Sequence, residues 1–291
     1  MTLTDHPLFA PRTLGSLALR NRVVMAPMTR RMAPETGVPT EAMTAYYRRR
    51  AAGEVGLIIS EGTAIDSRHA YDTPTVPRFE TEEHWEAWKR IVDAVHDEGG
   101  AFAPQLWHTG RLAEDPIGPS EGEAPPKRDG TPRPATRPMR SEDFAQVLGA
   151  FRHSAAAAKA IGCDALEIHG AHGYLLDSFL SPVDNRRTDR YGGSIENRMR
   201  FPLEVVRAVR EAVGPGFPVI YRFSQWKMDD YRELKFHTPD DLATWVHALR
   251  DAGVDILHVS TRDAMDSGFE AEGNRTLAAW SRALSGLPVI A

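Results

Sequence analysis

The feature that most constrains the fold is a repeat of short apolar runs, separated by longer stretches of helical character. The seven runs are RVVMAP, VGLIISEG, AFAPQLW, DALEIHG, PVIYRFS, DILHVST and LPVIA. Each is continuously apolar rather than alternating, as is typical of parallel strands that are covered on both faces. The stretches that we predict as crossover helices are 81–98, 141–161, 198–213 and 239–252. The pattern predicts an α/β fold with a parallel sheet.

The helix starts and the repeated units favour a barrel. The sequences TEEH, SEDF and TPDD each offer a Ser or Thr cap followed by an acid in the first turn. The segments AIGCDALEI and DAGVDILHV repeat one order of helix end, glycine, aspartate and strand. Such units build a parallel barrel or a doubly wound sheet, and no GxGxxG motif follows the first strand to favour the second. We predict a (β/α)8 TIM barrel, seen here through about strand seven.

Length and charge bound the kind of partner. One barrel fits 291 residues, so we predict a single domain over residues 1–291. Lys and Arg number 35 against 40 Asp and Glu, a formal net charge of −5, and the basic residues are scattered. This disfavours nucleic acid and an anionic membrane surface as partners and favours a small molecule. The oligomeric state stays open, a homo-oligomer included.

Cysteine usage and the apolar runs bear on location. Cys163 is the single cysteine, which excludes an intrachain disulfide and fits a reducing compartment. No run reaches about eighteen apolar residues, and the N-terminal segment lacks a basic region followed by an apolar one. We expect no membrane association and a cytoplasmic location.

Polar side chains gather at the predicted strand ends, where TIM barrels carry their catalytic groups. The densest cluster is HGAHGYLLDSFLSP, residues 169–182, with two imidazoles, a glycine and a phenol within six residues. Segment 114–138 is rich in proline and glycine and poor in apolar residues, so we expect a surface loop near the barrel mouth. Other residues at strand ends are Pro27, Met28, Thr29, Gly62, Gln105, Trp107, His108, Arg222 and Ser260.

Four segments carry a more specific signal: NRVVMAPMTR, QLWHTGR, HGAHGYLLDSFLSP and RRTDRYGGSIENRMRF. In this order, and over essentially the whole chain, they resemble the Old Yellow Enzyme family of FMN-dependent ene-reductases. The resemblance implies a TIM barrel that binds FMN and is reduced by NADPH or NADH. It also implies a substrate of the enone type, an α,β-unsaturated carbonyl compound whose activated carbon–carbon double bond is reduced.

The resemblance assigns FMN contacts to residues at the strand ends. Gln105 matches the family's glutamine, whose amide pairs with the pyrimidine edge of the isoalloxazine ring. Arg222 matches an arginine near N1 and the C2 carbonyl, where a fixed guanidinium stabilises the anionic reduced flavin. Thr29 falls where the family places a hydroxyl that donates toward the C4 carbonyl. The resemblance further implies that the ring is lined by Pro27, Met28 and Gly62.

The resemblance also assigns the catalytic residues. His169 and His172 match two side chains that hydrogen-bond the substrate carbonyl oxygen as it becomes enolate-like, in the manner of an oxyanion hole. Tyr174 matches the acid that protonates the α-carbon, and a phenol with a pKa of about 10 keeps its proton at neutral pH. Gly173 permits the tight turn between these roles. Some family members carry asparagine in place of His172, and both residues can donate to an oxygen.

Two other functions fit parts of the sequence. Strand-end histidines hold metals in barrel hydrolases, and His108 and His258 could converge with the HGAH motif, although no HxH pair ends the first strand. A metal-dependent TIM-barrel hydrolase predicts stoichiometric zinc and no yellow colour. A non-catalytic truncated barrel predicts normal secondary structure without flavin retention. The four ordered segments favour FMN and no metal.

The chain stops within LPVIA, the seventh predicted strand. An eight-stranded barrel needs one more unit, and the family's FMN phosphate is held mainly by the loops after strands seven and eight. We therefore expect the 291 residues to be part of a longer chain, with the phosphate-binding residues beyond residue 291. The sequence does not identify the physiological substrate, nor does it decide between NADPH and NADH.

Overall fold

The computed structural model describes residues 6–65, 69–124, 126–127 and 129–291, and a seven-stranded parallel sheet forms its centre. Neighbouring strands follow the order β11-β10-β9-β8-β5-β4-β3, and every pair is parallel. This order never reverses, unlike that of a doubly wound sheet, so the barrel prediction is confirmed through strand seven. The strands are β3 Val24–Met25, β4 Leu57–Ala64, β5 Ala101–Trp107, β8 Leu166–His169, β9 Val219–Ser224, β10 Ile256–Ser260 and β11 Val289–Ile290.

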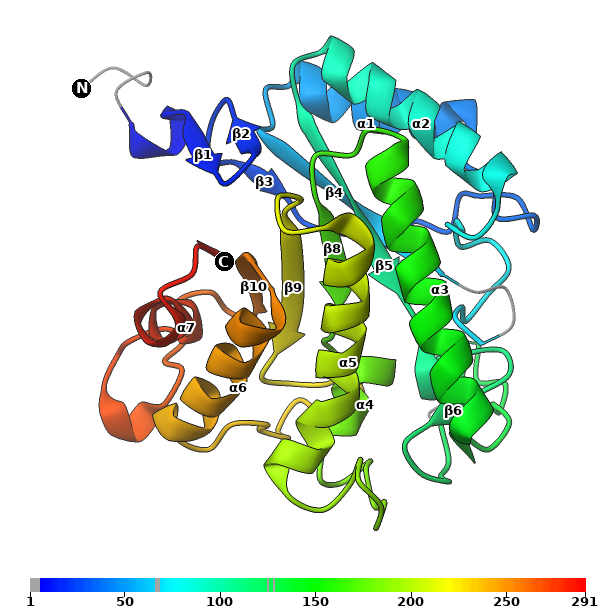
Figure 1. Ribbon diagram of the computed structural model, residues 1–291, viewed down its shortest axis with the longest axis vertical. Helices are drawn as coiled ribbons and strands as arrows, with labels where there is room; N and C mark the ends of the chain where they lie inside the picture. Colours follow the sequence, from blue (N-terminus) through cyan, green and yellow to red (C-terminus); the bar gives the residue numbers. More distant parts are fainter. Residues whose placement is uncertain (1–5, 66–68, 125, 128) are drawn as a thin grey trace.

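Helices surround the sheet on its outer side (Figure 1). The four predicted helices correspond to α2, α3, α5 and α6, whereas α1, α4 and α7 were not predicted. No helix in the described part of the chain is both long enough and apolar enough to cross a membrane. The helices are α1 Glu41–Ala52, α2 Glu82–Asp97, α3 Ser141–Ala160, α4 Leu175–Leu180, α5 Ile195–Val213, α6 Pro239–Ala252 and α7 Leu277–Ser285.

The predicted helix starts are correct for two helices and wrong for one. Thr81 and Thr238 are the N-caps of α2 and α6. Helix α3 already includes Ser141, and its N-cap is Arg140. The shift arises because Asp143 Oδ2 accepts from the Arg140 N–H at 2.7 Å and from Arg137 Nη1 at 2.6 Å. The acid at the third helical position thus satisfies the backbone N–H of the N-cap residue, as it does in a capping box.

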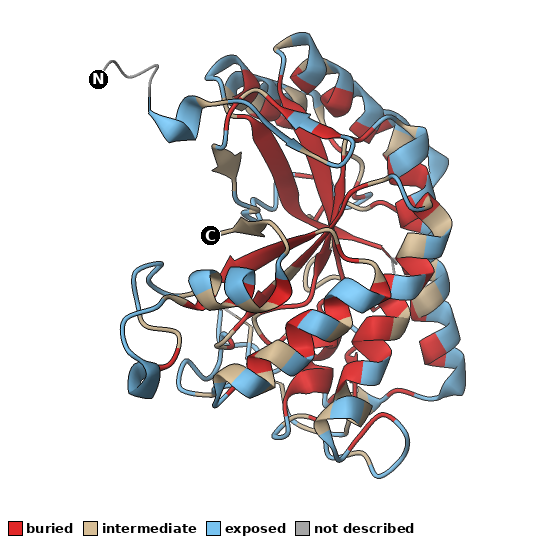
Figure 2. Ribbon diagram, turned by 60° about the vertical axis from the view of Figure 1, so that its left-hand side comes forward, coloured by how far each residue is buried: buried red, intermediate tan, exposed pale blue. Residues whose placement is uncertain are grey.

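The sheet separates two apolar cores. The larger core lies between the strands and the helices. Strands β4, β5, β8 and β10 are buried along their length, whereas the edge strands β3 and β11 are half-buried (Figure 2). The smaller core fills the barrel interior near the N-terminal ends of the strands. It is built mainly from Leu57, Ile59, Ala101, Ala103, Ala165, Ile220 and Ile256.

Further along the strands the barrel interior becomes polar. Gln105 pairs in register with Glu167, and Arg222 pairs with both His169 and His258. Register partners of parallel strands point to the same face, so these side chains occupy neighbouring positions above the apolar core. The interior therefore changes from apolar to polar toward the C-terminal ends, where a barrel enzyme carries its site.

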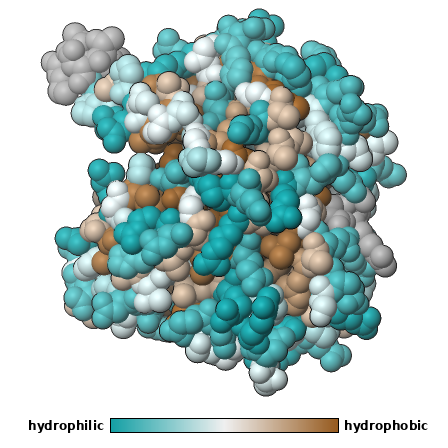
Figure 3. Space-filling view, viewed as in Figure 1, coloured by the Kyte–Doolittle hydropathy of each residue, from teal (hydrophilic) through white to brown (hydrophobic). Residues whose placement is uncertain are grey.

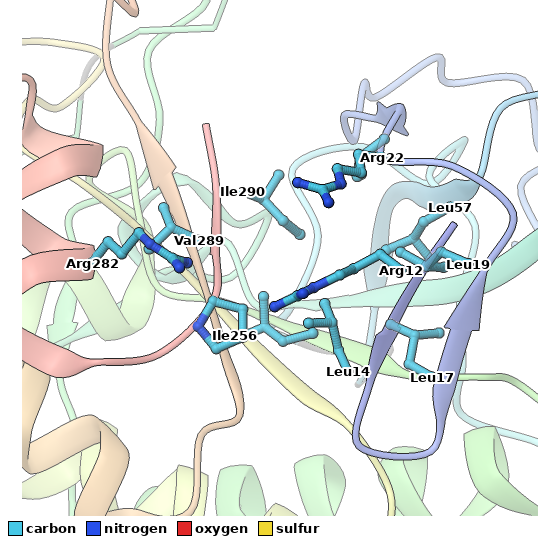
Figure 4. A pocket seen from close by; sticks show the side chains of 12 residues that line it. Arg12, Leu14, Leu17, Leu19, Arg22, Leu57, Ile256, Arg282, Val289 and Ile290 are labelled. Carbon is cyan, nitrogen blue, oxygen red and sulfur yellow. The ribbon is translucent and has the colours of Figure 1, made fainter. Parts of the chain in front are cut away.

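The sheet has two edges, β3 and β11, which are not paired with each other within the described residues. A cavity of about 250 Å³ opens between them, and Arg12, Arg22 and Arg282 reach into it among apolar side chains (Figure 4). A hairpin of β1 Arg12–Leu14 and β2 Leu17–Leu19 lies along one wall. The molecular surface is hollowed at this edge and shows hydrophobic patches (Figure 3). The cavity adjoins the apolar interior and contains none of the predicted site residues.

Segment 114–138 is less uniformly exposed than predicted. Its strand β6, Ile117–Gly118, pairs in parallel with β7, Arg137–Pro138. This pairing brings Ile117 into the larger core, where its side chain is fully buried. Positions 125 and 128 lie outside the described residues, and many of the other residues in the segment are exposed, as expected of a loop.

Candidate active site

The chain turns sharply after β8 and presents the predicted catalytic residues. His169 ends β8, His172 has a φ of 65°, Gly173 has a φ of 85°, and α4 begins after Tyr174. Positive φ is unfavourable for a residue other than glycine, and such strain persists only where neighbours hold it. The His172 N–H donates to Ser224 Oγ at 2.9 Å. The local backbone strain is therefore held by a contact to the next strand, β9.

The three predicted catalytic side chains lie together. The ring centroids of His169 and His172 are 5.3 Å apart, and those of His169 and Tyr174 are 5.0 Å apart, both edge to face. Trp107 contacts Tyr174 with centroids 5.0 Å apart, and Trp226 stacks on His172 at 4.5 Å. The two histidines and the phenol thus sit between two indoles, which limits the motion of all three.

Gly62 is required beside this cluster for a packing reason. A Cβ atom at Gly62 would lie 2.7 Å from Cε3 of Trp107. That separation is well below van der Waals contact, so only glycine lets the Trp107 ring take its place against β4. The predicted role of Gly62 as a lining residue therefore coincides with a structural role that holds Trp107.

Each histidine has one ring nitrogen engaged by the protein. The Ala171 N–H donates to His169 Nδ1 at 3.3 Å, which leaves Nε2 of His169. His172 Nε2 lies 2.8 Å from Ser260 Oγ, which leaves Nδ1 of His172. Within the described part of the chain these remaining nitrogens have no protein hydrogen bond. One open nitrogen on each ring is what two donors to a shared oxygen require.

Burial keeps both imidazoles neutral. Desolvation lowers the pKa of His169 well below its usual range, and the nearby charges of His172 and Arg222 lower it further. Desolvation likewise lowers the pKa of His172, with Arg222 and Lys235 adding to the effect. A neutral imidazole donates through one nitrogen and accepts through the other. The Ala171 N–H therefore assigns the donor role of His169 to Nε2, and His172 donates from Nδ1 when the Ser260 hydroxyl donates to its Nε2.

Gln105 and Arg222 lie within the polar interior of the barrel. Gln105 Nε2 donates to Glu167 Oε1 at 2.7 Å, and His258 Nδ1 lies 2.5 Å from Glu167 Oε2. Arg222 Nη2 donates to Ser260 Oγ at 3.3 Å, whereas the buried Nε of Arg222 has no hydrogen-bond partner in the described structure. Burial lowers the pKa of Arg222, and the negative charge of Glu167 opposes this shift.

Glu167 was not predicted as a site residue. Its side chain is completely buried. It precedes His169 by two positions on β8, and the two-residue period of a strand places both side chains on one face. That spacing was the available signal in the sequence.

Pro27, Met28 and Thr29 stand apart from the histidines. They follow β3 on a partly exposed segment, and the Met28 side chain is 53% exposed. The segment is tied to β4 because the Arg30 N–H donates to Glu61 Oε2 at 2.9 Å. Thr29 therefore precedes Arg30, which is anchored to Glu61, the residue before Gly62. The described structure shows no contact between Thr29 and the catalytic cluster.

A buried ion pair joins the catalytic turn to the loop after β9. Asp177 Oδ2 accepts from the Gly173 N–H at 2.6 Å and lies 2.9 Å from Lys235 Nζ. Lys235 Nζ also donates to the Trp226 carbonyl oxygen at 3.2 Å. Asp177 and Lys235 therefore hold the turn that carries Tyr174 and the loop that carries Trp226. Neither was predicted, because only the folded chain brings these two positions together.

Replacing Asp177 with asparagine should change the pH dependence of stability. Burial raises the pKa of Asp177 from 3.8 to about 6, although Lys235 opposes the shift. A carboxyl group whose pKa is raised by folding adds stability below its unfolded-state pKa and loses that stability as the pH rises through its folded-state pKa. Asparagine does not titrate. From about pH 4 to pH 7, the free energy of unfolding of the wild type should therefore fall by about 3 kcal/mol relative to that of Asp177→Asn. Urea unfolding measures the free energy of unfolding of both proteins over this pH range. An equal pH dependence for the two proteins would contradict the prediction.

The predicted metal alternative finds no grouped ligands in the described chain. His258 is engaged with Glu167, and His108 Nδ1 accepts from the Gly110 N–H at 3.0 Å. Among residues 6–65, 69–124, 126–127 and 129–291, no three His, Cys, Asp or Glu side chains are arranged to hold a metal ion.

Comparison with known proteins gives consistent matches. The model of the NADH:flavin oxidoreductase / NADH oxidase family matches residues 7–286. The 12-oxophytodienoate reductase 7 of Oryza sativa subsp. japonica is 42% identical over 224 residues, covering 72% of this chain and 56% of that protein. Morphinone reductase in complex with tetrahydroNAD has a TM-score of 0.83 at 34% identity, covering 98% of this chain and 80% of that chain. The old yellow enzyme homologue from Zymomonas mobilis has a TM-score of 0.85 at 31% identity, covering 98% and 81%. The matched part spans 40 to 57% of the length of the first curated relatives.

Proposed function

The chain belongs to the NADH:flavin oxidoreductase / NADH oxidase family, and we propose that it is an FMN-dependent ene-reductase. It would use NADPH or NADH to reduce the activated carbon–carbon double bond of an α,β-unsaturated carbonyl compound. One observation carries this proposal: two neutral histidines and a tyrosine lie together at the C-terminal end of β8, each histidine with an open ring nitrogen. This arrangement suits a carbonyl oxygen that gains negative charge beside a proton donor.

The open polar groups also fit FMN. Gln105 keeps its carbonyl oxygen available, since its amide nitrogen is turned to Glu167. Arg222 offers a buried Nε that lacks a hydrogen-bond partner among the described residues. An amide acceptor and a guanidinium donor match a flavin edge that carries N–H and carbonyl groups. We propose Gln105, Arg222 and Thr29 as polar contacts, with Pro27, Met28 and Gly62 lining the ring.

When bound, FMN would supply the hydride that reaches the β-carbon of the substrate. The residues of this chain do the remaining work. His169 and His172 would donate from Nε2 and Nδ1, respectively, to the carbonyl oxygen and stabilise its developing charge. Tyr174 would give its hydroxyl proton to the α-carbon. Trp107 and Trp226 pack against Tyr174 and His172, respectively, and would hold these side chains in place.

For the whole chain, we propose one FMN-binding domain over residues 1–291 and a cytoplasmic location. The location is supported by the single cysteine, Cys163, which is buried as a free thiol. Burial raises the pKa of Cys163 well above its usual range, as expected of an inert thiol.

The visible spectrum of purified, desalted protein after incubation with FMN tests the proposal. We expect a retained flavin band that shifts when para-chlorophenol is added, because a phenolate oxygen imitates the enolate oxygen at the two histidines. A colourless protein with normal circular dichroism would instead support the non-catalytic alternative. Stoichiometric zinc without a flavin band would support the hydrolase. Free and bound flavin separate by gel filtration, which provides the control.

A further inference from the structure

Glu167 is a buried acid for which the proposed reaction has no direct use. Its side chain is fully buried on β8, and both of its oxygens are engaged. Oε1 accepts from Gln105 Nε2 at 2.7 Å, and Oε2 lies 2.5 Å from His258 Nδ1. A carboxylate is costly to bury without partners, so a structure retains it where those partners need it.

The carboxylate restricts how the Gln105 amide can be turned. An ionised carboxylate accepts hydrogen bonds and cannot donate them, so the side of the amide that faces Glu167 must be its NH₂ group. The Gln105 Oε1 atom then points away from Glu167, and no protein donor in the described part of the chain engages it. The other hydrogen of Nε2 stays free as a donor. One acceptor and one donor are thus presented in a fixed order.

His258 keeps Glu167 in place from the opposite side. It lies on β10, where it pairs in register with Arg222 of β9. Glu167 therefore spans the barrel interior from Gln105 on β5 to His258 on β10. Its charge also acts on Arg222, whose pKa it raises against the effect of burial.

We propose that Glu167 is a positioning residue that fixes the Gln105 amide with its carbonyl oxygen toward the ligand, so that the site selects the N3–H edge of FMN. This inference rests on the proposed function, because it deepens the FMN contact of Gln105. His258 is the support that holds Glu167. Without Glu167, the Gln105 amide can rotate by half a turn and present a donor where the ligand needs an acceptor.

FMN labelled with ¹⁵N at N3 tests the inference directly. In the wild type we expect an N3–H cross-peak that is protected from exchange with water and displaced from its position in free FMN. In Glu167→Leu the cross-peak should lose its protection, and FMN should bind about tenfold more weakly, the value of one amide hydrogen bond. Glu167→Gln keeps the side-chain volume while allowing either amide orientation. Its N3–H protection and FMN affinity should therefore lie between those of the wild type and those of Glu167→Leu.

Asp143→Asn is the matched control. Asp143 is also a buried acid, but it lies in the first turn of α3 and contacts Arg137 and the Arg140 N–H rather than Gln105. Its variant should keep the protected N3–H signal. An unchanged N3–H signal in both Glu167 variants, with FMN bound, would overturn the inference while leaving the proposed function intact. Failure of the wild type to bind FMN would instead overturn the proposed function, and the inference with it.

Discussion

Replacing Tyr174 with phenylalanine should slow reduction of cyclohex-2-enone by about 10²- to 10⁴-fold, the usual contribution of a positioned proton donor. Reduction of bound FMN by NADPH or NADH should stay within about twofold of the wild type, because the tyrosine acts only on the substrate in the proposed reaction. Stopped-flow measurement of the two half-reactions separates these effects. The ring contacts of Tyr174 with Trp107 and His169 remain in phenylalanine, so the change removes the hydroxyl alone.

Two further measurements make this test decisive. If the lost group is the proton donor, protonation from solvent limits the rate of Tyr174→Phe, and its solvent isotope effect on enone reduction should be larger than that of the wild type. Met228→Leu is the control, because Met228 Sδ accepts the Tyr174 hydroxyl hydrogen at 3.6 Å and its loss leaves the phenol in place. Equal slowing of both half-reactions by Tyr174→Phe would show that the residue shapes the flavin site instead of donating the proton.

The strands were predictable because their runs are continuously apolar and end in polar residues. Helix α1 was missed because its sequence, EAMTAYYRRRAA, has a weak apolar stripe, although Met43 and Tyr47 are buried. Helix α4 was missed because it has six residues and lies within the catalytic turn. Local patterns therefore identified the elements with a strong period, whereas tertiary packing determined the short or weakly patterned ones.

The residues of the candidate site likewise differ in how far the sequence predicted them. His169, His172 and Tyr174 were accessible to prediction because they lie within six residues of each other after one strand. Ser260 appeared only as a strand end, and its contacts with His172 and Arg222 depend on the pairing of β9 with β10. Lys235 could not be found because its partner Asp177 lies far away in sequence. Local sequence thus predicted the residues proposed to contact substrate, whereas the residues that support them emerged from the folded chain.

Replacing His169 and His172 together with alanine should weaken binding of para-chlorophenol by about 10²- to 10⁴-fold. Each substitution removes one hydrogen bond to the negatively charged phenolate oxygen, worth about 1.5–3 kcal/mol. Both pKa values are lowered by burial, so in the wild type neither histidine should add an inflection to the binding curve between about pH 6.5 and 8. Titration of the flavin band measures the affinity across this range.

The structure offers a control that separates the donor role from packing. His153 lies on α3 and contacts the ring of Trp85, away from the catalytic turn, so His153→Ala should bind the phenol as the wild type does. His172→Asn keeps a donor and should restore most of the affinity that His172→Ala loses. Because His172 occupies a positive φ, which asparagine tolerates well, this exchange also spares the backbone. Phenol affinity that is unchanged in the double alanine variant would remove both histidines from the carbonyl-binding role.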